Sequence, residues 1–108
     1  MSDWASWAIQ QLQRGQMVAI RPRGHSMRGL IADGQRVTLA PLQAGEPRVG
    51  DVVLCRVRGR TMLHRVHAVG PRGYAIANAR GHLNGWCPRT QIFGRWTGGP
   101  RHSAPRSL

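Results

Sequence analysis

The sequence predicts a mainly β domain that begins with one short helix, and three observations lead to this prediction. Short apolar runs alternate with turns that contain Gly and Pro along most of the chain, which is typical of an antiparallel sheet. A helical period of apolar residues occurs near the N-terminus, over residues 3–13. The length of 108 residues suits one small domain and is too short for two.

The expected helix over residues 3–13 rests on apolar residues that recur at i, i+3, i+4 and i+8: Trp4, Trp7, Ala8 and Leu12. Asp3 is a suitable N-cap and Gly15 a suitable stop. We expect the tryptophan face of this helix to pack on the domain. The alternative is an interfacial anchor, because tryptophan suits the boundary of a bilayer.

Strands are expected over residues 17–22, 36–40, 51–57, 61–69, 74–78 and 91–96. The fourth of these follows the third through a tight turn at residues 58–60, so the two form a hairpin. Structural turns are assigned to Asp33, Gly34, Gly50 and Asp51. Residues 41–47 and 81–88 are expected to be loops. The domain then covers residues 1–96, and the basic tail of residues 97–108 is expected to be disordered.

The chain is strongly basic, with a formal net charge of +12, and all 16 basic residues are arginines. This charge attracts nucleic acid, anionic membrane or acidic protein through its long-range field. The arginines are scattered and form no basic block, so an unspecialised basic surface is favoured over dedicated DNA binding. No signal peptide and no apolar run long enough to span a membrane is visible, which predicts a cytoplasmic protein. Peripheral membrane association is the alternative.

Chemistry is expected around the stretch from Arg21 to Met27. An apolar strand precedes it, and Pro22 and Gly24 break that strand and leave Ser26 on a turn. A serine on such a turn is held out of the sheet beside free backbone N–H groups, where a nucleophile could act. Three further motifs follow in order: Asp33-Gly34, Val49-Gly50-Asp51-Val52-Val53 and Leu63-His64-Arg65-Val66-His67.

The order of these motifs, from Val18 to Arg95, resembles the signal peptidase I/LexA superfamily of serine peptidases. The resemblance implies a coiled β-sheet fold and a catalytic Ser26. It also implies a general base directly before Arg65-Val66. Most of the superfamily uses lysine there, whereas this chain contains no lysine and has His64. A branch of signal peptidases in archaea and the endoplasmic reticulum also has histidine at this place, so the resemblance implies a Ser26–His64 dyad.

Strand alternation places His64 on one face with Met62, Val66 and Ala68, and His67 on the other. Apolar neighbours would lower the pKa of His64 and keep the imidazole neutral, as a base near pH 7 requires. A half-buried strand histidine with one hydrogen bond and no catalytic role is the alternative.

The oxyanion hole is expected from the backbone N–H of Ser26, with Gly24 allowing close approach of the substrate. Histidine-type relatives carry a downstream Gly-Asp that supports the base, but here the matching place reads Gly81-His82-Leu83-Asn84. The candidate orienters of His64 are therefore Asn84 and His82. Asp51 is the last acidic residue of the chain and could also approach the site.

Metal chemistry competes for the same residue types, but the spacing of the histidines and cysteines fits no zinc pattern, so neither a metal nor another cofactor is predicted. Two cysteines are too few for a disulfide framework. Cys55 reads as a small buried hydrophobe, and whether it meets Cys87 stays open.

The resemblance therefore predicts a serine peptidase. Only 25 residues precede Ser26, so cleavage of a protein or peptide in trans is expected rather than self-cleavage. The first alternative is a peptide-binding module that has lost catalysis. The second, which is less favoured, is a basic module associated with nucleic acid.

Overall fold

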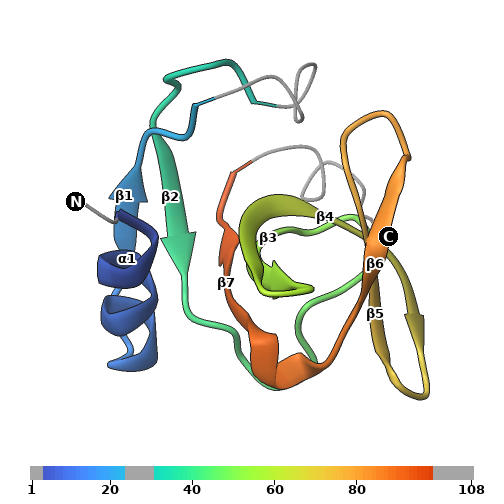
Figure 1. The fold of residues 1–108 in the computed structure, drawn as a ribbon. Helices are drawn as coiled ribbons and strands as arrows, with labels where there is room; N and C mark the ends of the chain where they lie inside the picture. Colours follow the sequence, from blue (N-terminus) through green and yellow to red (C-terminus); the bar gives the residue numbers. More distant parts are fainter. Residues whose placement is uncertain (1–3, 24–30, 99–108) are drawn as a thin grey trace, which may run out of the picture.

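Alternating apolar runs and turns build an antiparallel sheet in the computed structural model, which describes residues 4–23 and 31–98. Its elements are α1 (Trp4–Gln13), β1 (Val18–Ile20), β2 (Val37–Ala40), β3 (Val52–Val57), β4 (Arg60–Gly70), β5 (Gly73–Ala77), β6 (Leu83–Cys87), the 3-10 turn η1 (Arg89–Gln91) and β7 (Ile92–Trp96). Within the described ranges, seven strands form one sheet in the order β1-β2-β7-β3-β4-β5-β6 (Figure 1). The prediction of a mainly β protein with one short helix at its start is confirmed.

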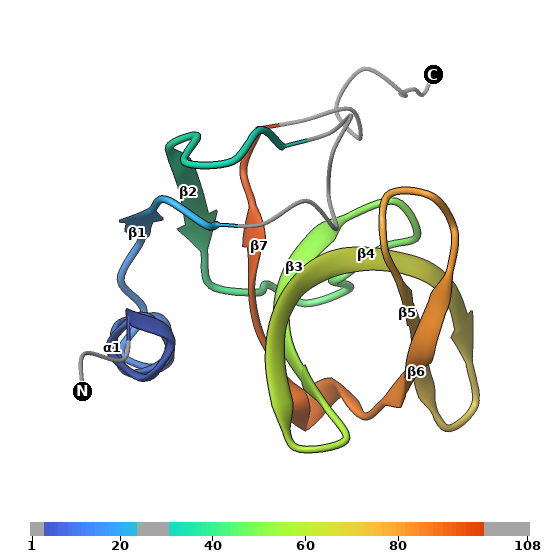
Figure 2. The same ribbon diagram turned by 45° about the horizontal axis from the view of Figure 1, so that its top comes forward.

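The sheet rolls up on itself at the end formed by β3, β4, β5 and β6 (Figure 2). The long strand β4 curves around this roll, and its pairing with β5 contains a bulge between Val66 and Ala68. An extra residue in one strand bends it and increases its twist. The roll closes through side chains, because β6 reaches β3: a Cβ on Gly85 would lie 3.0 Å from Cγ1 of Val57.

Two apolar cores lie on the two sides of β3, because successive side chains of a strand point to opposite faces. Val52 and Leu54 belong to the first cluster, which β1, β2 and α1 complete. Val53, Cys55 and Val57 belong to the second cluster, inside the roll. β3 is thus the central wall of the domain, and it shows a near-continuous apolar run in place of an alternating one.

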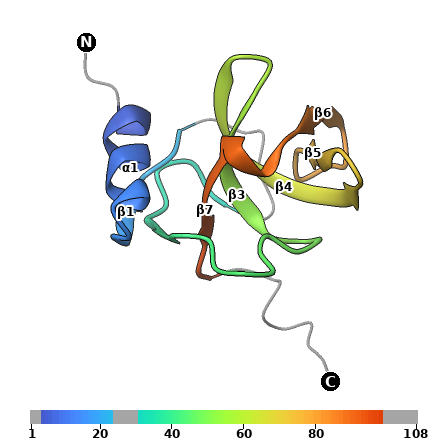
Figure 3. The same ribbon diagram turned by 90° about the horizontal axis from the view of Figure 1, so that it is seen from below.

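Helix α1 packs on the sheet against β1 and β7 (Figure 3). Glycine at position 94 permits this close approach, since a Cβ there would lie 2.8 Å from both the Ala40 carbonyl oxygen and Cδ1 of Leu12. The buried residues of this helix are Ala8 and Leu12, which belong to the expected face, and Ile9, which does not.

The expectation that the tryptophan face packs on the domain is wrong, because Trp4 and Trp7 are 45% and 49% exposed. At about 3.6 residues per turn, Leu12 lies between Ala8 and Ile9 on the helix wheel, and the two tryptophans fall on the flank of that stripe. Among the described residues, no helix is long and apolar enough to cross a membrane.

Two predicted boundaries need correction. Residues 81–88 were expected to be a loop, but they contain β6, which pairs with β5 through Tyr74–Cys87 and Ala75–Trp86. Asn84 and Gly85 disfavour a strand locally, and pairing with β5 overrides that preference. The tail was expected to begin at residue 97, yet Thr97 donates hydrogen bonds from its N–H and from Oγ1 to the Thr38 carbonyl oxygen, so it extends the pairing of β2 with β7.

Candidate active site

The two residues that sequence analysis placed at the nucleophile turn, Gly24 and Ser26, lie outside the described residues, which omit 24–30. The flanking residues are described. Pro22 accepts a hydrogen bond from the N–H of Gly34, in the turn predicted at Asp33 and Gly34. Ile31, where the description resumes, is buried in the first cluster together with Leu63, the residue before His64.

The predicted base, His64, lies in the middle of β4 and is 7% exposed. It pairs with Val53 across the β3–β4 ladder, and its neighbours Met62 and Val66 pack in or against the second cluster. The expected face of the strand is observed for these residues, and His67 is exposed. Ala68 had been expected to share this face as well, but it does not.

The bulge in β4 explains this difference. Val66 pairs with Ile76, whereas Ala68 pairs with Ala75, the next residue of β5 and therefore on the opposite face. The extra residue, His67, shifts the alternation by one position. The side chains of β4 therefore alternate between the two faces of the sheet as expected up to Val66, and the bulge shifts this alternation beyond it.

The ring of His64 is oriented by the backbone of its own strand. Nδ1 lies 2.7 Å from the carbonyl oxygen of Leu63. A carbonyl oxygen only accepts hydrogen bonds, so Nδ1 carries the proton and Nε2 keeps its lone pair. Burial lowers the pKa of His64, and the bond to the Leu63 carbonyl offsets part of that effect. His64 is therefore neutral near pH 7, in the tautomer that accepts a proton at Nε2.

A buried carboxylate lies on the same face of the sheet as His64. The N–H of Val66 donates to the Asp51 carbonyl oxygen at 2.8 Å, which extends the β3–β4 ladder by one pair beyond Val52–Arg65. Asp51 and Val53 are two residues apart and share a face, so Asp51 is the diagonal neighbour of His64. Such diagonal pairs lie about 7–8 Å apart.

Asp51 was predicted as a turn residue, and it does close a turn: Oδ2 accepts the N–H of Arg48 at 2.8 Å, and the Asp51 N–H donates to the Arg48 carbonyl. Its side chain, however, is fully buried. A carboxylate buried near a neutral imidazole stabilises the imidazolium when the ring takes up a proton.

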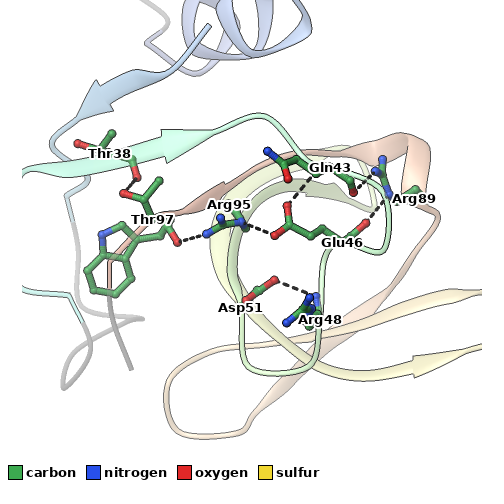
Figure 4. A network of polar contacts seen from close by, with 9 residues as sticks. Thr38, Gln43, Glu46, Arg48, Asp51, Arg89, Arg95 and Thr97 are labelled. Carbon is green, nitrogen blue, oxygen red and sulfur yellow. Dashed lines mark hydrogen bonds and ion pairs between the residues drawn. The ribbon is translucent and has the colours of Figure 1, made fainter. Parts of the chain in front are cut away.

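On the other side of Val53 lies Arg95 of β7. Val53 pairs with both His64 and Arg95, so the three residues lie side by side across the sheet. Arg95 forms an ion pair with Glu46, with 2.8 Å between Nε and Oε2 (Figure 4). The second carboxylate oxygen of Glu46 accepts the N–H of Gln43 at 3.0 Å, and its backbone carbonyl accepts Nε of Arg89 at 2.7 Å. These contacts fasten the loop between β2 and β3 to β7, and they compensate the charge of Arg95 near the site.

The assignment of Asn84 and His82 as orienters of His64 stays a prediction. Asn84 lies on β6, which β5 separates from β4 in the sheet order, and His82 precedes β6. His82 is exposed, and its backbone carbonyl accepts the N–H of Asn78. Oδ1 of Asn84 is buried and has no hydrogen-bond partner among the described residues. The residues that the structure offers for this task are Leu63, through its carbonyl, and Asp51.

The two cysteines meet inside the second cluster, where both are buried as free thiols. The hydrogen bond to Cys87 and burial raise the pKa of Cys55. The same bond lowers the pKa of Cys87, against the effect of burial. Within the described ranges, no group of three or more His, Cys, Asp or Glu side chains could hold a metal ion.

Comparison with known proteins adds no relative to this geometry: no family model matches the chain, and neither a curated protein nor a solved structure gives a significant match.

Proposed function

We propose that this chain is a serine peptidase of the signal peptidase/LexA type that cleaves a protein or peptide in trans, with Ser26 as nucleophile and His64 as general base. The observation that carries the proposal is the state of His64: buried in β4, neutral, and held by the Leu63 carbonyl with Nε2 free to accept a proton. A strand histidine with a purely structural role would hold the same tautomer, because the Leu63 carbonyl fixes it, so the labelling experiment below separates the two interpretations. The rolled sheet is compatible with the coiled β fold of that superfamily.

In the proposed reaction, Oγ of Ser26 attacks the scissile carbonyl carbon while Nε2 of His64 takes the hydroxyl proton. The imidazolium then gives this proton to the leaving amine, and an acyl-enzyme ester remains on Ser26. Water, deprotonated by the neutral His64, attacks the ester and releases the acid product and free serine. The N–H of Ser26, with Gly24 beside it, would stabilise the oxyanion.

The proposal assigns two different tasks to the surroundings of His64. The Leu63 carbonyl fixes the tautomer and the ring orientation, which a carboxylate performs in a catalytic triad. Asp51 supplies the negative charge that stabilises the imidazolium formed during acyl transfer. A downstream carboxylate such as the histidine-type relatives carry is then not required.

A fluorophosphonate probe tests the nucleophile and the base together. The wild-type protein should be labelled at Ser26, and Ser26→Ala and His64→Ala should each abolish most labelling and most cleavage of a peptide substrate. The two substitutions should combine non-additively, because nucleophile and base act as one unit. His67→Ala is the matched control, since it removes an exposed histidine of the same strand, and it should leave labelling intact.

The pH dependence gives a second readout. Labelling should rise with pH as His64 loses its proton, and the midpoint should lie below the ordinary histidine pKa of 6.5, because burial lowers the pKa. Labelling that is unchanged in His64→Ala would refute the mechanism. A folded protein that is never labelled at Ser26 and still binds peptides would instead be a peptide-binding module without catalysis.

A further inference from the structure

The outer face of β4, β5 and β6 carries a half-exposed tryptophan. Trp86 lies opposite Ala75 in the β5–β6 ladder, and Ala75 lies opposite Ala68 in the β4–β5 ladder. The side chain of Trp86 is 56% exposed, whereas Ala75 beneath it is buried. One side of the indole thus rests on a floor of small residues, and the remainder is open to solvent.

Glycine at position 70 completes this floor. A Cβ at Gly70 would lie 3.0 Å from Cζ3 of Trp86 and 3.2 Å from Cη2, so only glycine leaves the outer end of the ring in its place. Trp86, Pro71 and Arg72 line an open cavity of about 450 Å³ beside the β4–β5 turn. The turn and β6 lie at the end of the molecule opposite α1 (Figures 1 and 3). A supported aromatic ring beside a guanidinium group is therefore presented to solvent.

The charges around this ring are positive. Residues 60–87, which form these three strands, contain four arginines and no acidic residue. Arg72 is exposed at the cavity. Arg65 lies on β4, two strands away from β6, and its Nε is buried. Arg72 is therefore the exposed cation beside the tryptophan.

We propose that this face binds single-stranded nucleic acid, with one base stacked on Trp86 in the cavity and the adjoining phosphate bound by Arg72. A stacking ring within a positively charged track is the combination that single-stranded nucleic acids require, because every base has a π-face and every linkage a negative charge. An acidic peptide would use the arginines but not the ring. The proposed site is separate from His64 and does not depend on the peptidase proposal.

The test measures the anisotropy of a labelled single-stranded DNA oligonucleotide bound to the full chain at several salt concentrations. Trp86→Ala should weaken binding about five- to a hundredfold, which is the effect of losing one base–aromatic stack. Trp7→Ala is the matched control, because Trp7 is comparably exposed at the opposite end of the molecule, and it should leave the affinity unchanged. Arg72→Gln should reduce the slope of log K against log salt by roughly 0.7, as expected for one phosphate contact.

A second pair of variants keeps the proposal falsifiable if Trp86→Ala does not fold. Trp86→Phe retains a ring and should keep most of the affinity, whereas Trp86→Leu retains apolar bulk without a ring and should lose it. Equal binding by Trp86→Phe, Trp86→Leu and the wild-type protein would overturn the proposal and assign the binding to the general positive charge. Competition by polyglutamate as strong as by unlabelled oligonucleotide would likewise overturn it and indicate an acidic protein partner.

Discussion

Acidification should destabilise this protein through His64 in a way that one substitution can isolate. Burial lowers the pKa of His64 in the folded state below the ordinary value of 6.5, which the unfolded chain retains. Between these two values the unfolded state binds one proton more than the folded state, so the free energy of unfolding falls as pH falls. The slope for one proton is about 1.4 kcal/mol per pH unit. The loss begins near pH 6.5 and levels off below the folded-state pKa.

Urea unfolding from roughly pH 7 down to pH 5 measures this loss, with the wild-type protein compared to His64→Gln. A glutamine amide can still donate to the Leu63 carbonyl but does not titrate. The carboxylates titrate in both proteins, so their contribution cancels in the difference. The stability advantage of the wild-type protein over His64→Gln should therefore shrink by up to about 1.4 kcal/mol per pH unit below pH 6.5.

The control for this experiment is His67→Gln, because His67 is exposed on the same strand. This variant should retain the pH dependence of the wild-type protein. A difference between wild type and His64→Gln that stays constant across the same range would refute the reasoning. His64 would then have the same proton affinity in the folded and unfolded states, and the neutral base on which the peptidase proposal rests would lose its physical cause.

Two further predictions concern the surroundings of the site. Arg95→Met removes the ion pair with the buried Glu46 carboxylate and should lower the free energy of unfolding in denaturant by about 3–5 kcal/mol. Glu46→Gln combined with Arg95→Met should recover part of this loss. A double variant no more stable than Arg95→Met alone would contradict the contribution of the ion pair. Cys55 is buried, and the bond to Cys87 and burial raise its pKa. It should therefore resist iodoacetamide in the folded protein and react after unfolding, as mass spectrometry would show. Rapid alkylation of native Cys55 would contradict its burial.

Local sequence patterns could predict those parts of the fold that depend on apolar spacing. The hairpin of β3 and β4 has two apolar runs joined by a short turn at Arg58 and Gly59, and both strands were expected at nearly their observed positions. β6 was missed because Asn84 and Gly85 have low strand propensity, and only its pairing with β5 makes it a strand. For α1, the predicted stripe contained the buried Ala8 and Leu12, but it included the exposed Trp4 and Trp7 in place of the buried Ile9.

At the candidate site, the sequence indicated His64 but not what surrounds it. The burial of His64 follows from apolar neighbours two residues away on β4, which are visible in the sequence. The burial of Asp51 follows from the register of β3 against β4, which pairs it with Val66 through backbone hydrogen bonds. A Gly-Asp dipeptide contains no such information, because most are simply turns. The two-residue turn fixes the register of the hairpin, and this register places Asp51 diagonally opposite His64.

The proposed base does not require one group that both orients and stabilises it. Orientation needs only an acceptor for the proton on Nδ1, and the carbonyl of Leu63 is an acceptor that no sequence motif displays. The bond to the Leu63 carbonyl offsets only part of the effect of burial on the pKa of His64, so the ring stays neutral, whereas a carboxylate in contact with Nδ1 would raise this pKa further. Under the proposed mechanism, charge compensation is needed only while the imidazolium exists, and we propose that the buried Asp51, one diagonal position away, supplies it.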